Sequence, residues 1–60
     1  MSNDSALLRD YIESLGMDGR ELTQEDIVKL SEVFLENDDS SMASFVLQFK
    51  KNPNELLDYI

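Results

Sequence analysis

The chain has 60 residues, of which 42% are hydrophobic, enough for one small core but not for a second domain. Thirteen acidic residues face five basic ones, so the formal net charge at pH 7 is −8, and both cysteine and histidine are missing. This composition excludes disulfides, thiolate metal sites, and the usual zinc ligands and histidine bases of catalysis.

The first helix is predicted over residues 4–15. The stretch 3–5 offers three suitable N-caps in a row. The apolar positions that follow have the spacing of one helix face: Leu8, Tyr11, Ile12 and Leu15. Gly16 then stands where a left-handed residue usually ends a helix, and residues 17–21 are predicted to form a turn.

A second helix is predicted over residues 24–36, and it has the strongest local signals in the chain. Thr23 is a suitable N-cap, and Asp26 stands where a capping box places its acidic residue. Leu22 and Ile27 occupy the two positions of a hydrophobic staple. The inward stripe and its flanks are formed by Ile27, Leu30 and Phe34, with Val28, Val33 and Leu35 beside them. Such a wide stripe indicates contact with two neighbouring helices, or an uncovered patch.

A third helix is predicted over residues 40–51, after capping residues in the stretch 37–40. Its apolar face is formed by Met42, Phe45, Val46 and Phe49. Lys50 and Lys51 suit the negative end of the helix dipole.

A short last helix is predicted over residues 53–59, with Asn52 as N-cap and Pro53 at the first helical position. The four segments, joined by short turns, predict an all-α fold: a small three- to four-helix bundle that forms a single domain over residues 1–60.

Catalysis and metal binding are disfavoured by the residues present. Serine nucleophiles have no histidine base here, and 60 residues do not readily build a cleft that raises the pKa of one carboxylate. A calcium loop that began at Asp38 would place Ser40, Met42 and Ala43 at its third, fifth and sixth positions, which does not fit an EF-hand. We therefore expect a protein that is not an enzyme and binds no cofactor.

The charge also restricts the partners. The five basic residues are scattered and outnumbered, so direct binding of nucleic acid or of anionic membranes is not expected. No signal peptide is visible in residues 1–4, and the longest apolar run is only Phe45-Val46-Leu47, so a cytoplasmic location is expected. A larger protein with a basic or apolar surface is the expected partner.

Two groups of residues are candidates for contact with such a partner. The first is the densest acidic cluster, and the second is the apolar excess that falls partly outside the helix stripes. The candidate set is Glu32, Glu36, Asp38 and Asp39, together with Leu35, Leu47, Leu56, Leu57, Tyr59 and Ile60. The apolar members either close the bundle or mark a patch for a partner.

These features favour a small acidic interaction module that regulates, inhibits or completes a larger protein. Its size suggests a product of a phage or another mobile element. One alternative is a DNA mimic, whose carboxylates imitate phosphates and block a nucleic-acid-binding enzyme. A second alternative is a self-assembling helical homodimer, supported by the wide apolar face of residues 24–36.

Overall fold

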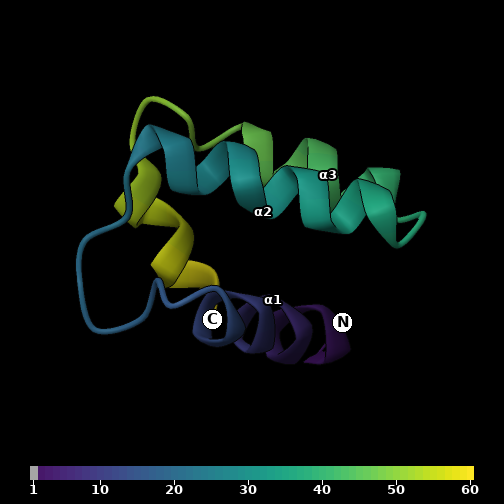
Figure 1. The fold of residues 1–60 in the computed structure, drawn as a ribbon, viewed down its shortest axis with the longest axis horizontal. Coiled ribbons are helices and arrows are strands. Elements are labelled where there is room, and N and C mark those ends of the chain that lie inside the picture. The colour runs from purple at the N-terminus through teal and green to yellow at the C-terminus, as the bar shows by residue number, and fades with distance from the viewer. Residues whose placement is uncertain (1) are drawn as a thin grey trace.

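Three α-helices and a short 3-10 helix make up the structure, a computed structural model that describes the backbone of residues 2–60 and the side chains from Asp4 onward. In chain order they are α1 (Ser2–Ser14), α2 (Gln24–Glu36), α3 (Ser40–Leu47) and the 3-10 helix η1 (Pro53–Tyr59). Helices α2 and α3 lie side by side and antiparallel, and they make the closest pairing of elements (Figure 1). Helix α1 lies across from this pair, and η1 connects the two layers at one end (Figure 1). The predicted all-α bundle is confirmed.

The end of α1 explains the one error in its predicted face. Gly16 adopts a left-handed φ of 72°, as predicted. Its N–H donates to the Glu13 carbonyl at 3.1 Å, and the Met17 N–H reaches back to the Ile12 carbonyl at 2.9 Å, the two bonds of a Schellman motif. This turn leaves Leu15, which was predicted to point inward, 40% exposed, and it buries Met17 in its place. The helix also begins at Ser2, before the predicted start at residue 4.

Helix α2 has the boundaries predicted from the sequence. The Thr23 hydroxyl accepts the Asp26 N–H at 3.2 Å, while the Asp26 carboxylate accepts the Thr23 N–H at 2.8 Å. This capping box satisfies two backbone donors that the helix itself leaves without partners. Leu22 and Ile27, the predicted staple, are both buried.

A second Schellman motif forms the turn between α2 and α3. The Asp38 N–H donates to the Leu35 carbonyl at 3.0 Å, and the Asp39 N–H donates to the Phe34 carbonyl at 2.9 Å. Asp38 holds a left-handed φ of 60°, where glycine is the usual residue. The Asp39 carboxylate then caps α3 by accepting the Met42 N–H at 3.2 Å. These two acids therefore shape the turn.

Helix α3 ends at Leu47, so the prediction that it continues to residue 51 is wrong. The next three N–H groups, of residues 48–50, donate to carbonyls three residues back, and this tighter pattern turns the chain toward η1. Pro53 stands at the start of η1 as predicted, but the element is a 3-10 helix and the Asn52 side chain makes no capping bond.

The core lies between all four elements. Its fully or largely buried side chains are Leu8, Ile12, Met17, Leu22, Ile27, Leu30, Phe34, Met42, Ala43, Val46, Phe49 and Leu56. The rings of Tyr11 and Phe34 meet edge to face with centroids 4.9 Å apart, which joins α1 to α2. Across residues 2–60, none of the helices combines the length and the apolar character needed to cross a membrane.

Candidate interaction surface

The acidic candidates divide into two pairs with different surroundings. Glu32 and Glu36 are four residues apart on the exposed side of α2. Asp38 is also exposed, whereas Asp39 is half-buried and holds the first turn of α3. Within residues 2–60, the structure brings no three carboxylates together in a group that could hold a metal ion.

The apolar candidates also divide. Leu35 is 53% exposed, and Leu47 and Leu57 are exposed to a similar degree. Tyr59 is 57% exposed, and Ile60 is half-buried against the core. Leu56, in contrast, is completely buried because it is the inward residue of η1, so its assignment to a partner surface is wrong.

A groove of about 330 Å³ lies between α1, the start of α3 and the end of η1. Its lining residues come from three separate parts of the chain: Asp4, Ser5 and Leu8, then Asp39, Ser41, Met42 and Phe45, and lastly Tyr59. Leu8 and Met42, which are almost completely buried, contribute apolar surface there, with the two aromatic rings beside them. The groove is therefore an opening onto the edge of the core.

The two aromatic residues that line the groove, Phe45 and Tyr59, belong to a cluster of three rings. Phe45, Phe49 and Tyr59 pack edge to face in a triangle, with centroids 5.3, 5.3 and 5.4 Å apart. Such pairs add stability beyond the area that they bury. They hold the exposed Tyr59 ring in place, so it presents a fixed apolar surface to the groove.

The charged side chains among the described residues that line the groove are both carboxylates. Asp4 and Asp39 belong to its lining, and none of the described lining residues is a lysine or an arginine. One Asp39 oxygen accepts the Met42 N–H, while in the described part of the chain no side chain donates to the other. The groove thus combines an apolar interior with carboxylates that retain hydrogen-bonding capacity.

A second hollow, of about 440 Å³, lies beside α2, but it has a different character. Its lining is Gln24, Glu25, Val28, Lys29, Glu32 and Lys50. Because this lining carries both signs of charge and a single apolar residue, it offers little to an apolar group. Glu32 is the one candidate residue that it contains.

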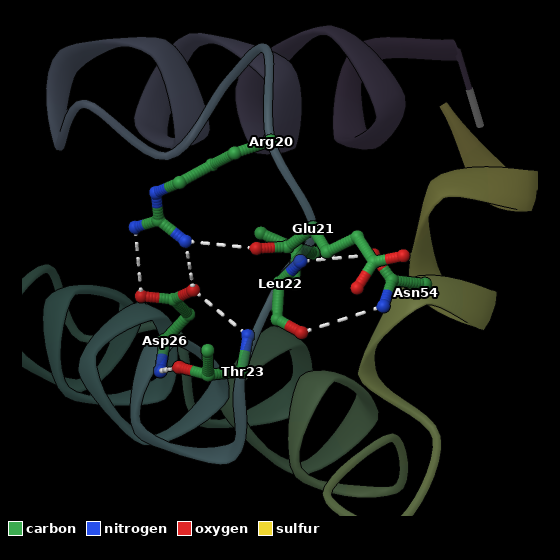
Figure 2. Close-up of polar contacts among 6 residues, drawn as sticks. All are labelled: Arg20, Glu21, Leu22, Thr23, Asp26 and Asn54. Atoms are coloured by element: carbon green, nitrogen blue, oxygen red, sulfur yellow. Dashed lines mark hydrogen bonds and ion pairs between the residues drawn. The ribbon is translucent and has the colours of Figure 1, made fainter.

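A polar clasp fixes the loop between α1 and α2 (Figure 2). Arg20 forms two hydrogen bonds to the Asp26 carboxylate, at 2.7 and 3.1 Å, and also donates to the Glu21 carbonyl at 2.9 Å. The Arg20 guanidinium and the Thr23 backbone N–H lower the pKa of Asp26 to about 2, although burial opposes this shift. The pKa of Arg20 is raised by the same ion pair.

The clasp continues to η1 through Asn54. Its side-chain oxygen accepts the Leu22 N–H at 2.9 Å, and its side-chain nitrogen donates to the Leu22 carbonyl at 3.4 Å, as Figure 2 shows. The side-chain amide thus bonds to Leu22 as a neighbouring peptide group would. This link holds the first turn of η1 against the loop, and the same element carries Tyr59 to the groove.

Several residues of the groove were not among the candidates from the sequence. Asp4, Leu8, Met42 and Phe45 were predicted only as helix-cap or core residues. The apolar face predicted for residues 40–51 includes Phe45, but nothing in the local sequence indicates that residues 4–8 lie opposite this face in the bundle.

The fold and the groove together define a small helical bundle with an acidic, partly apolar surface groove. Comparisons of the chain with protein-family models, with curated proteins and with solved structures gave no match.

Proposed function

We propose that this protein is a non-enzymatic interaction module that regulates, inhibits or completes a larger protein. The observation that carries this proposal is the groove between α1, α3 and η1, with its apolar interior and its carboxylates. Apolar surface left uncovered in a rigid setting is typical of binding sites. The overall charge of −8 adds long-range attraction toward a basic partner.

Helix α3 offers a matched pair of variants to test this proposal. Ser41 lines the groove, and Ser44 is an exposed serine of the same helix outside it. Ser41→Trp fills the groove without removing a core contact, and Ser44→Trp adds the same bulk elsewhere. Both variants should retain the helical circular dichroism spectrum and the unfolding midpoint of the wild type.

The assay is affinity capture from an extract of the organism that encodes the chain, with quantitative mass spectrometry. A partner should be retained by the wild type and by Ser44→Trp, and reduced about tenfold or more by Ser41→Trp. Equal capture by both variants, or no partner above background, would refute the proposal.

A DNA mimic would behave differently in the same assay. Its binding would depend on the exposed acids of α2, namely Glu25, Glu32 and Glu36, and it would fall steeply with salt. Asp38 and Asp39 are left out of this comparison because Asp38 holds the left-handed turn and Asp39 lines the groove itself. A triple glutamine variant at the three glutamates that abolishes capture, while Ser41→Trp does not, would favour the mimic instead.

A further inference from the structure

The chemistry of the groove defines the kind of partner that fits it. We propose that the groove binds a short basic segment of a partner protein, in which one large apolar side chain is flanked by lysine or arginine. The apolar side chain packs against the surface that Phe45 and Tyr59 present to the groove, and the basic residues meet Asp4 and Asp39. This inference rests on the proposed function, whose partner it specifies.

The size of the groove favours a side chain over a cofactor or metabolite. Its volume of about 330 Å³ is at the lower limit of ligand pockets, which hold roughly 300–1,000 Å³. It also opens along the surface between three elements, so it would bury little of a free small molecule. A side chain that is anchored on a peptide needs less enclosure, because its neighbours make further contacts outside the groove.

The interior of the groove selects an apolar anchor. Phe45 and Tyr59 offer ring surface, and Met42 offers a flexible thioether that adapts to different shapes. Tyr59 remains 57% exposed although two ring contacts hold it in position. An apolar side chain placed against this ring would remove it from water without requiring a rearrangement of the fold.

The charge around the groove selects a basic partner and disfavours a second copy of the chain. A second copy would bring another eight negative charges toward Asp4 and Asp39, and the two molecules would repel each other at low salt. Lysine or arginine beside the anchor would instead pair with these carboxylates. The second Asp39 oxygen can accept such a bond while the first still caps α3.

Selection from a displayed library of random twelve-residue peptides tests this proposal on the full chain. Enriched peptides should contain an aromatic or large aliphatic residue next to lysine or arginine. Their affinity for Ser41→Trp should be about tenfold or more below that for Ser44→Trp. Because a protein of charge −8 attracts basic peptides over its whole surface, only the difference between these two variants counts.

Two further comparisons separate the parts of the site. Asp4→Asn combined with Asp39→Asn should weaken binding about three- to tenfold at low salt, while Glu32→Gln combined with Glu36→Gln should leave it nearly unchanged. If Ser41→Trp does not fold, Tyr59→Ser replaces it, with Leu57→Ser as the exposed control on the same helix. Binding should persist at about 0.5 M salt, where charges are screened within a few ångströms.

The inference is overturned if the enriched peptides lack this pattern, if none is enriched, or if the selected peptides bind the filled and unfilled grooves equally. A self-association constant in the micromolar range that Ser41→Trp abolishes would show that the occupant is a second copy. A protein captured through the groove by a neutral or acidic segment would leave the proposed function intact and refute only the partner chemistry. Enriched basic peptides without any captured protein would support the partner chemistry and refute the proposed function.

Discussion

Replacing Asp26 with asparagine tests how much of the stability depends on the polar clasp. The carboxylate accepts two hydrogen bonds from Arg20 and one from the Thr23 N–H. Asparagine keeps the shape but turns an NH₂ group or a neutral oxygen toward the guanidinium. The variant therefore loses the ion pair, and at least one donor in the clasp loses its partner.

The shifted pKa sets the magnitude of the loss. The Asp26 pKa falls from an ordinary value of 3.8 to about 2, and a shift of one unit corresponds to about 1.4 kcal/mol. Because the Arg20 side chain is 46% exposed and partly screened by water, we expect the carboxylate charge to contribute about 1–2 kcal/mol. The mismatched hydrogen bond adds about 1 kcal/mol at any pH. The total is a large share of the few kcal/mol available to so small a domain.

The assay is urea unfolding, followed by circular dichroism between pH 6 and pH 2, on the wild type and on Asp26→Asn. The folded-state pKa is the lower one, so the contribution of the charge is fully present above pH 4 and is lost as the pH falls toward 2. The difference in unfolding free energy should therefore be about 2–3 kcal/mol at pH 6 and about 1 kcal/mol near pH 2. Taking this difference removes the effect of the other carboxylates, which titrate in both proteins.

Asp18→Asn, an exposed change in the same loop, is the control, and it should alter stability by less than about 0.5 kcal/mol. A wild-type advantage that stays constant with pH would refute the role of the charge. A variant as stable as the wild type at pH 6 would refute the role of the clasp as a whole.

Three further substitutions test other parts of the fold. Leu56→Ala should lower the free energy of unfolding by about 2–5 kcal/mol and strongly lower the midpoint of a thermal melt, whereas Leu57→Ala, at an exposed position, should change the midpoint little. Similar midpoints for the two variants would contradict the burial of Leu56. Asn54→Ala should cost about 1–3 kcal/mol and speed hydrogen exchange at the Leu22 amide, and unchanged exchange there would disprove the clasp to η1. Asp38→Gly should raise the free energy of unfolding by about 1 kcal/mol in urea titrations, because glycine relieves the backbone strain of the left-handed φ of 60°. An equal gain in Asp38→Asn would assign the effect to charge alone.

Local signals account for what was predicted correctly. Helix α2 could be placed to the residue because its capping box and staple lie within six consecutive positions, 22–27. Gly16 was assigned to the end of α1 for the same reason. Leu15 and Met17 were misplaced because a Schellman motif rotates the chain within two residues, so the helical spacing no longer applies beyond Ser14.

Tertiary contacts account for what was missed. The apolar pattern of residues 40–51 continues to Phe49, and Phe49 is indeed buried, but its ring reaches the core from a tight turn after α3. The groove could not be predicted from the sequence for a related reason. Its walls come from residues 4–8, residues 39–45 and Tyr59, and no spacing within one segment indicates that these three parts meet.

The clasp that joins Asn54 to Leu22 and the groove that Tyr59 helps to line belong to the same short element, η1. A ligand held in the groove would thus bind only to chains in which η1 has docked, and its affinity would be coupled thermodynamically to the docking of this element. Copies in which η1 is detached from the bundle would not bind the ligand. Occupancy would in turn slow the local opening of η1, and slower hydrogen exchange at its amides would register this protection.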